Sequence, residues 1–177
     1  MYPPQTLTTD RLILRLPRRE DAPIIFASYT QDPEVTRYLT WRPHKSVDES
    51  YAIIDLNLKL WREGTAFTYV IALKETDTPI GKIAIHADGF KPSLGYVLAR
   101  SQWGKGYMTE VVRVVTDWLL HQPDIFRVSA TCDVDNPASA KVMEKAGMKY
   151  EGLLRRYIIH PNVSAEPRDC LMYARVR

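Results

Sequence analysis

One segment, residues 94–120, constrains the fold of this chain more than any other. It begins with an apolar, β-prone run at 94–99, passes through a polar turn at 100–106 and ends in a stretch with helical periodicity. The turn carries Gly104 and Gly106, on either side of a lysine, directly before the helix. A helix start presents unpaired N–H groups and a positive dipole end, and glycines let an anion approach that backbone closely. The segment therefore predicts a cradle for a phosphorylated ligand.

Hydrophobic periodicity places further strands and helices along the chain. Alternating or β-branched runs predict strands at residues 11–16, 67–73, 80–86, 126–133, 150–159 and 168–176. Apolar residues at helical spacing predict helices at 19–31, at 46–62 and at 136–146. The last of these begins at Asn136, a capping residue, followed by a proline that a first helical turn tolerates. Residues 34–45 have no clean period and predict a short helix and a loop. The order of elements predicts an α+β domain built on a mixed sheet.

The length and composition are those of one globular domain, residues 1–177, with 45% hydrophobic and 25% charged residues. The chain lacks a long apolar run and a signal-peptide pattern, so a cytoplasmic protein without a membrane partner is expected. Its formal charge of +3 comes from scattered basic residues, which disfavours direct nucleic-acid binding. Cys132 and Cys170 are far apart without metal-ligand spacing, so reduced thiols and no metal are expected.

Two common phosphate-binding motifs do not match the turn before the helix. A P-loop would need serine or threonine after its Gly-Lys pair, but Lys105 is followed by Gly106. A dinucleotide-binding fingerprint would need a third glycine where this chain has Thr109. The turn instead resembles the acyl-CoA loop of the GNAT N-acetyltransferase superfamily, Gln/Arg-x-x-Gly-x-Gly/Ala. Gly104 and Gly106 fit this pattern, whereas Ser101 stands at its first position.

Three segments resemble the ribosomal-protein (RimJ/RimL-like) branch of that superfamily, in the expected order: 7–22, 103–110 and 136–148. The resemblance implies a GNAT-like central mixed, mostly antiparallel β-sheet of about seven strands flanked by about four helices. It also implies direct transfer of an acetyl group from acetyl-CoA to a primary amine, either a protein N-terminal α-amine or the amine of a small molecule. It leaves a homodimer open. The alternative is a non-catalytic acyl-CoA-binding sensor or regulatory domain.

The resemblance also implies which residues contact acetyl-CoA. Backbone groups of residues 97–100 would hydrogen-bond the pantetheine arm, and N–H groups of the loop at 102–108 would hold the pyrophosphate. The implied contacts are Val97, Leu98, Ala99, Arg100, Gln102, Trp103, Gly104, Lys105, Gly106, Tyr107, Met108, Asn136 and Ser139. Among nearby cations, Lys105 lies inside the loop, whereas Arg100, Arg113 and Lys141 are more simply interpreted as solvated surface charges.

Ser139 is the leading catalytic candidate. With Asn136 as the cap, Ser139 falls in the first turn of its helix, where its hydroxyl would act as general acid towards the departing thiolate. Many GNAT enzymes have a tyrosine at the position of Met143, which has no acidic proton, and the RimJ/RimL-like branch carries a serine at the position of Ser139. The alternative is that Ser139 only supports the helix cap.

The general base is left open by the sequence. Relatives often carry an acidic residue where this chain has Ser93. Glu110 is a candidate that also suits the helix dipole, and His86 has a suitable pKa but ends a strand, as many surface histidines do. Asp169 would orient the substrate amine or pair with a neighbouring arginine, and a base acting through water is compatible with all three. The two cysteines show no neighbouring His or Asp pattern, which argues against an acyl-enzyme.

The acceptor amine is not identified by the sequence. Aromatic and acidic residues of the early helices and the C-terminal hairpin would form a mouth suited to a cationic N-terminus, a polyamine or an aminoglycoside. In the alternative, the aromatic residues belong to the core and the acids are solvated. The residues concerned are Tyr38, Trp41, Trp61 and Tyr157, with Asp32, Glu34, Asp48 and Glu49.

Overall fold

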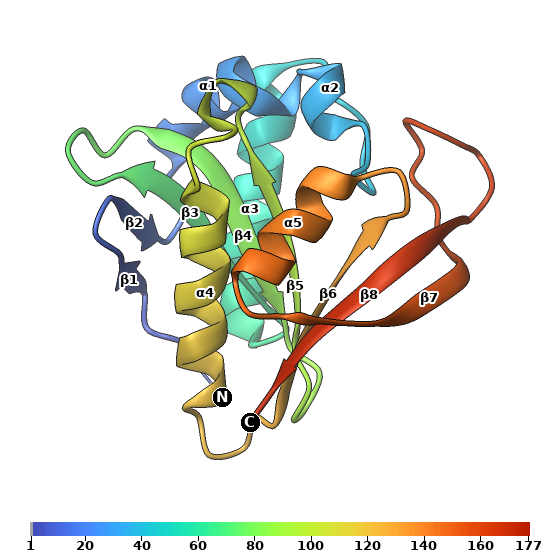
Figure 1. The fold of residues 1–177 in the computed structure, drawn as a ribbon. Coiled ribbons are helices and arrows are strands. Elements are labelled where there is room, and N and C mark those ends of the chain that lie inside the picture. The colour runs from blue at the N-terminus through green and yellow to red at the C-terminus, as the bar shows by residue number, and fades with distance from the viewer. Residues whose placement is uncertain (1) are drawn as a thin grey trace.

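The computed structural model describes residues 2–177, and its strands form one eight-stranded sheet (Figure 1). The strands are β1 Thr6–Thr8, β2 Leu12–Arg15, β3 Ala66–Leu73, β4 Pro79–His86, β5 Ser93–Leu98, β6 Arg127–Asp133, β7 Lys149–Ile158 and β8 Arg168–Val176. They lie in the order β1-β2-β3-β4-β5-β6-β8-β7. Neighbouring strands are antiparallel except β5 and β6, which are parallel. The predicted α+β fold with a mixed, mostly antiparallel sheet is confirmed.

Helices cover both faces of this sheet. The α-helices are α1 Ala22–Ile25, α2 Pro33–Thr36, α3 Val47–Glu63, α4 Tyr107–Leu120 and α5 Pro137–Lys145. Shorter turns are the 3-10 helices η1 Arg19–Asp21 and η3 Arg100–Gln102 and the π-helix η2 Phe26–Thr30. Figure 1 shows α4 and α5 in front of the sheet and α3 behind it, with α1 and α2 across one end.

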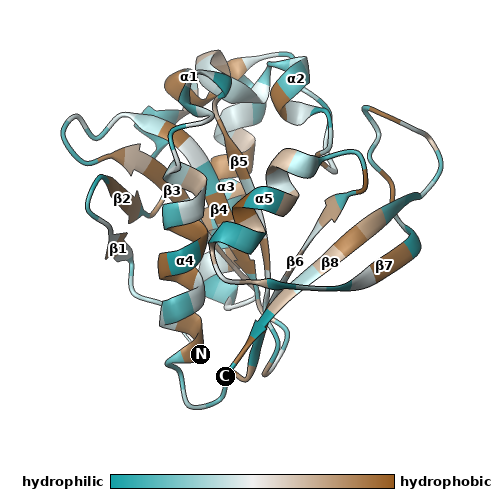
Figure 2. Ribbon diagram, viewed as in Figure 1, coloured by the Kyte–Doolittle hydropathy of each residue, from teal (hydrophilic) through white to brown (hydrophobic). Residues whose placement is uncertain are grey.

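Each face of the sheet packs a hydrophobic cluster of its own. On the α4 face, Val111 and Val115 pack in one cluster with Ile71 of β3. On the α3 face, Ile54 packs in a second cluster with Val70 of β3. Because side chains alternate across a strand, adjacent residues of β3 enter different clusters. Each such buried side chain contributes roughly 1.5–3 kcal/mol. Figure 2 shows the hydrophobic colour concentrated on the central strands.

Two details differ from the sequence predictions. The sheet has eight strands rather than about seven, because the short β1 pairs with β2. The helix predicted over 19–31 is divided into η1, α1 and η2, since Pro23 lacks an N–H group and begins a new helical segment. The short helix expected within 34–45 is α2, and the rest of that segment is a loop, as predicted. The helix predicted at 46–62 is confirmed as α3, which ends at Gly64 in the left-handed conformation (φ 72°).

A gap between β5 and β6 opens the middle of the sheet. Within the described residues these strands pair at two positions, Ser93 with Ser129 and Leu94 with Ala130. Beyond these pairs the strands diverge, and β6, β8 and β7 turn away from the rest of the sheet (Figure 1). The gap positions the candidate site, because it connects the α4 face with the α3 face.

Candidate active site

A cavity of about 1280 Å³ follows the gap between β5 and β6. One end, which we call the loop end, is lined by the glycine-rich loop at 102–106 and by the first turns of α4 and α5. The opposite end, which we call the α2 end, is lined by residues of the segment 34–41, by β3 and β4, and by residues 157–160. The cavity therefore joins two sets of residues that lie on different faces of the sheet.

The backbone of the loop end is arranged to receive an anion. Gly104 and Gly106 have φ angles of 75° and 79°, in the left-handed region that other residues rarely adopt. Gly106 is the N-cap of α4 and provides no side-chain cap, so the first N–H groups of that helix remain free. A Cβ atom added to Gly104 would have no neighbour within 4 Å, which leaves this part of the loop open to a ligand. The loop therefore has the backbone geometry on which the predicted anion cradle depends.

Arg11, which the sequence analysis missed, braces this loop from the β1–β2 turn. Its guanidinium donates to the carbonyl of Lys105 at 3.0 Å and lies 4.4 Å from the ring centre of Tyr107. It also pairs with Glu110 at 2.7 Å, and the hydroxyl of Thr9 donates to the same carboxylate. Partial burial alone would raise the pKa of Glu110, but these hydrogen bonds outweigh it and hold the pKa below its usual value. Glu110 is thus a fixed anion that ties α4 to the N-terminal strands.

Most of the residues expected to contact acetyl-CoA line the cavity. Those in the wall are Val97, Leu98, Gln102, Trp103, Gly104, Gly106, Tyr107, Met108, Asn136 and Ser139. Ala99, Arg100 and Lys105 are outside the wall. Arg100 pairs with Asp32 at 3.1 Å, and the ammonium of Lys105 donates to the side chain of Gln102 at 2.9 Å. The cations of the wall at this end are instead Arg11, Arg113, Lys141 and Lys145.

The edge of β5 that faces the gap has free backbone groups. The N–H of Ala99 donates to the carbonyl of Ile80 in β4 at 2.8 Å. Because hydrogen bonding alternates along an antiparallel pair, Tyr96 and Leu98 turn their backbone groups towards the gap. The indole N–H of Trp103 donates to the Leu98 carbonyl at 2.8 Å. A ligand in the gap would therefore find Tyr96 rather than Ala99 with unpaired backbone groups.

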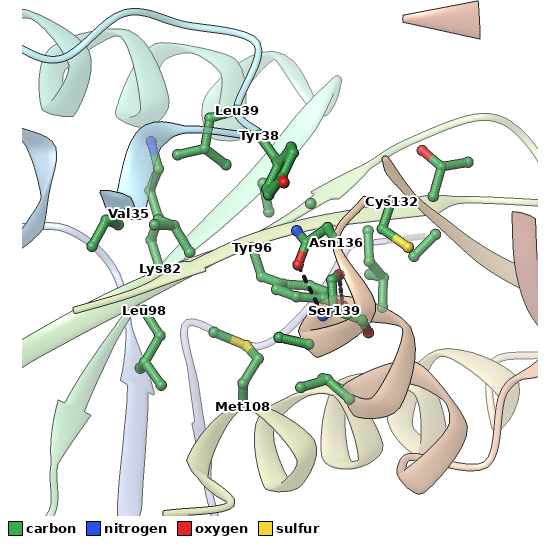
Figure 3. Close-up of a pocket in the computed structure, with 18 of the residues that line it drawn as sticks. Val35, Tyr38, Leu39, Lys82, Tyr96, Leu98, Met108, Cys132, Asn136 and Ser139 are labelled. Atoms are coloured by element: carbon green, nitrogen blue, oxygen red, sulfur yellow. Dashed lines mark hydrogen bonds between the residues drawn. The ribbon is translucent and has the colours of Figure 1, made fainter. Parts of the chain in front are cut away.

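Ser139 and Tyr96 form a hydroxyl pair in the wall (Figure 3). The Asn136 side chain accepts a hydrogen bond from the Ser139 N–H at 3.2 Å, which confirms Asn136 as the cap of α5. The Ser139 hydroxyl lies 2.8 Å from the Tyr96 hydroxyl. Burial raises the pKa of the Tyr96 phenol, so it stays protonated. Met143, at the position where many relatives have a tyrosine, is fully buried in the core.

The candidate bases differ in whether they line the cavity and in which partners they have. The Asp169 carboxylate accepts from the Arg156 N–H at 2.8 Å and is not in the cavity wall. His86 lies in the wall, opposite Ser93 in the β4–β5 ladder, and its imidazole makes no hydrogen bond or ion pair with another residue of 2–177. Burial and the nearby charge of Lys82 lower the pKa of His86, so its imidazole is mainly neutral at pH 7. His86 is therefore the candidate best placed to accept a proton.

Both cysteines are buried and free. Cys132 lies in the cavity wall, whereas Cys170 is next to His160, with 3.8 Å between its sulfur and the imidazole. That imidazole is also 3.7 Å from Asp133, so the fold assembles a Cys-His-Asp cluster that the sequence spacing did not predict. Burial raises the pKa of each thiol to about 11, which keeps both protonated and poorly nucleophilic.

The α2 end is aromatic, as one of the two alternatives predicts, but it is hardly acidic. Tyr38, Trp41 and Tyr157 line the wall, whereas Trp61 is buried in the core. Of the four acids expected at this mouth, only Glu34 lines the cavity. Asp32 caps α2 and pairs with Arg100, and Glu49 accepts from the Lys45 N–H. The expectation of an acidic mouth is therefore wrong for three of its four acids.

Lys82 lies in the wall of the α2 end and was missed by the sequence analysis. Its ammonium lies 5.2 Å from the ring centre of Trp41. Desolvation lowers its pKa to about 8. The only sequence signal for it was a charged residue inside an alternating apolar strand, at the position Gly-Lys-Ile of residues 81–83.

Within residues 2–177, no group of three or more His, Cys, Asp or Glu side chains is arranged to hold a metal ion. None of the helices described there is long and apolar enough to cross a membrane.

Comparisons with known proteins agree with this geometry. The family model for the acetyltransferase (GNAT) domain matches residues 11–149. The uncharacterized N-acetyltransferase p20 of Bacillus licheniformis is 35% identical over 86% of this chain and 87% of its own. The self-immunity acetyltransferase MccE of microcin C7, solved with acetyl-CoA and AMP, has a TM-score of 0.86 at 21% identity and covers 96% of this chain and 94% of its own.

The ribosomal branch is represented among the structural neighbours. RimL, a ribosomal L7/L12 α-N-protein acetyltransferase solved with coenzyme A, has a TM-score of 0.83 at 23% identity and covers 96% of both chains. At such identities the two solved structures establish the shared fold alone. The family model and p20 establish family membership as well, since each match spans most of the sequence. The chain belongs to the GNAT family of acetyltransferases.

Proposed function

We propose that this acetyltransferase moves an acetyl group directly from acetyl-CoA to a primary amine, on a protein N-terminus or a small molecule. The observation that carries the proposal is the continuous cavity, which joins the loop end to the α2 end and has the Tyr96–Ser139 pair in its wall. The eight-stranded sheet, with strands from Thr6 to Val176, supports treating the chain as one catalytic domain. RimL and MccE, which share the fold, bind coenzyme A or acetyl-CoA and support the choice of cofactor.

The loop end fits the pyrophosphate and pantetheine of acetyl-CoA. The free N–H groups at the start of α4 and the positive dipole end of that helix favour two adjacent phosphates. Gly104 leaves room for close approach, and Arg113 and Lys141 add positive charge to the wall. The unpaired backbone of Tyr96 would hydrogen-bond the amide groups of the pantetheine arm, as a neighbouring strand would. The donor set therefore matches a long anionic molecule with an amide-containing arm.

His86 serves as the general base in this proposal. It takes a proton from the acceptor ammonium, so that the neutral amine nitrogen attacks the thioester carbonyl. Relatives often carry an acid at the position of Ser93, and His86 is the residue directly across the ladder from it. Opposite residues of an antiparallel pair point to the same face at close range. His86 thus lies beside the position of such an acid, on the same face of the sheet.

Ser139 and Tyr96 stabilise the leaving group. As the new C–N bond forms and the C–S bond breaks, the Ser139 hydroxyl donates to the departing sulfur while Tyr96 donates to the Ser139 oxygen. The position of Ser139 in the first turn of α5 adds the favourable helix dipole. A thiol has a pKa of about 8.5 in water, so a thiolate is already a good leaving group. The hydrogen bond from Ser139 stabilises it further. The protonated thiols of Cys132 and Cys170 support direct transfer rather than an acyl-enzyme.

The test is a screen for release of free coenzyme A from acetyl-CoA with N-terminal peptides, polyamines and aminoglycosides as acceptors. We expect turnover with at least one amine, and Ser139→Ala should lower kcat by about tenfold, the effect of losing one hydrogen bond to a charged group. The KM for acetyl-CoA should change little. An unchanged kcat would remove Ser139 from the mechanism. Tight binding of coenzyme A without turnover of any amine would favour the sensor.

A further inference from the structure

We propose that the acceptor of this enzyme carries an anionic group, a carboxylate or a phosphate, apart from its reacting amine, and that Lys82 binds that group at the α2 end. The inference rests on the proposed function, because it names the class of amine that enters the same cavity. It departs from the polyamines and aminoglycosides that an acidic mouth would have favoured.

Lys82 is placed on the acceptor side of the sheet. It lies on β4 between Val70 of β3 and Val97 of β5, both of which pack in the cluster on the α3 face. Figure 3 shows Lys82 on one side of the strand with Tyr38 and Leu39, and Ser139 on the other side. The ammonium therefore lies away from the hydroxyl pair, where it would meet a different part of the acceptor from the reacting amine.

The ammonium of Lys82 has no anionic partner among residues 2–177. It forms no ion pair within 4 Å and no hydrogen bond, and its recorded neighbour is the face of Trp41. Arg15 provides the contrast, since this buried guanidinium is held by the carboxylates of Asp21 and Asp77 at 2.8 and 2.7 Å. A buried cation is normally paired, because removing a charge from water costs several kcal/mol. Lys82 is half-buried in the cavity wall, so its ammonium faces the cavity without an anionic partner from the part of the chain that the structure describes.

The surroundings leave this charge uncompensated. His44 and His86 both have a pKa lowered by burial and by the charge of Lys82, so near neutral pH neither adds charge nor removes it. The carboxylate of Glu34 is in the wall but exposed to solvent, and the buried carboxylate of Asp133 is paired with Arg168 at 2.6 Å. Desolvation lowers the pKa of Lys82 to about 8, so most of the ammonium is charged at pH 7. This field repels a second amine of an acceptor and attracts an acid group.

The first experiment compares matched acceptors that differ only in the anionic group. Suitable pairs are ethanolamine with phosphoethanolamine, butylamine with 4-aminobutyrate, and peptides with Gln or Glu after the N-terminal residue. We expect the wild-type enzyme to favour the anionic member by about ten- to a hundredfold in kcat/KM, the range of a hydrogen bond to a charged group. Lys82→Met should abolish this preference, Lys82→Arg should keep most of it, and KM for acetyl-CoA should not change.

Lys59→Met is the matched control, because it removes one positive charge from the exposed side of α3 outside the cavity. It should leave the acceptor preference unchanged. Equal turnover of anionic and neutral members, or the same preference in Lys82→Met, would overturn the inference while leaving the proposed function intact. A preference for diamines would overturn it as well. Comparing the phosphate pair with the carboxylate pairs shows which of the two anionic groups the enzyme prefers.

A second measurement does not depend on turnover. Reductive methylation with ¹³C-formaldehyde keeps lysine charged, and the dimethylamine signal of Lys82 is identified by its absence from Lys82→Met. Titration with glutarate or inorganic phosphate, in the presence of acetyl-CoA, should shift this signal and leave that of Lys59 in place. A signal that neither anion moves would overturn the inference. If the anions move it but no amine of any class is acetylated, the proposed function fails and the anion site remains.

Discussion

The two ends of the cavity are built in different ways. The loop end is built mainly on two short stretches of chain, residues 102–110 and the first turn of α5, with side chains such as Arg11 at its margin. It presents backbone N–H groups and helix dipoles. The α2 end is assembled from side chains of α2, β4 and the β7–β8 connection, which are far apart in sequence. A backbone site depends on local conformation, and a side-chain site depends on tertiary packing. The two ends should therefore respond to mutation separately.

The largest effect should come from Arg168, which lies outside the cavity wall but pairs with Asp133, a residue of that wall. Arg168→Met leaves the carboxylate of Asp133, which is fully buried at the end of β6, without its ion pair at 2.6 Å. Such a change costs about 3 kcal/mol or more of unfolding free energy. We expect a large drop in the denaturant midpoint, with weaker binding at both ends, measured by urea unfolding and by the KM of each substrate.

The same pair predicts a loss of stability in acid. Burial raises the pKa of Asp133, but hydrogen bonds from Arg168 and from the Asp135 N–H outweigh it and hold the pKa below its usual value. Its contribution to stability is complete above about pH 4 and is lost as pH falls through the lowered pKa. In Arg168→Met, the free energy of unfolding should depend less on pH in this acidic range than it does in the wild type. An unchanged urea midpoint would show that the pair does not stabilise the fold.

The second largest effect concerns the α2 end. His86→Gln should lower kcat/KM by about a hundredfold, the effect of losing a general base, with little change in the KM for acetyl-CoA. The wild-type rate should rise with pH through the lowered pKa of His86, below about 6.5, because only the neutral imidazole accepts a proton. His86→Gln should lose that acidic limb. His121→Gln, at the end of α4 and outside the wall, should retain it.

A third, smaller effect concerns the loop end. Gly106→Val places a β-branched residue at a φ of 79° beside the phosphate cradle, so the loop must rearrange. We expect KM for acetyl-CoA to rise about tenfold while KM for the acceptor stays the same. Gly89→Val is a matched control, because Gly89 also has a positive φ (51°) but lies outside the cavity wall. A similar rise in Gly89→Val would assign the effect to general destabilisation.

The smallest effect should come from the buried thiol in the wall. Cys132→Ala should leave kcat within about threefold, since the thiol lies beside Ser139 but forms no bond to the acetyl group in direct transfer. Mass spectrometry of wild type mixed with acetyl-CoA alone should detect no acetyl thioester on Cys132, whose raised pKa keeps it protonated. Loss of turnover in Cys132→Ala, or an acetylated thiol that an amine discharges, would contradict direct transfer.

The same contrast explains how much of the site the sequence could reveal. Gly104, Gly106 and the Asn136 cap are local signals, because glycine before a helix and asparagine at its start have a fixed conformational meaning. The strands were also recognisable from alternation and β-branched residues. Tyr96 lies within a predicted strand, but its hydrogen bond with Ser139 depends on how α5 crosses β5.

The missed residues needed tertiary information. Lys82 and Arg11 are single charges in polar–apolar patterns, and nothing local distinguishes them from solvated side chains. Arg11 reaches Glu110 across nearly a hundred positions, and Lys82 meets Trp41 only after α2 is placed beside β4. The acids expected at the mouth failed for the same reason, since Asp32 was drawn into an ion pair with Arg100. At the α2 end, the role of a charged side chain depends on which partner it pairs with, and tertiary packing determines that partner.

The divergence of β5 and β6 gives the sheet a third edge, in its interior. Open sheets usually expose unpaired strands at their two ends, where other chains can add to them and aggregate. Here the interior edge at Tyr96 is flanked by α5 and by the turned-away strands, so another sheet has no room to dock. A single extended molecule still fits. The backbone of β5 thus stays available for hydrogen bonds to a ligand, without the risk of aggregation that an exposed strand edge usually carries.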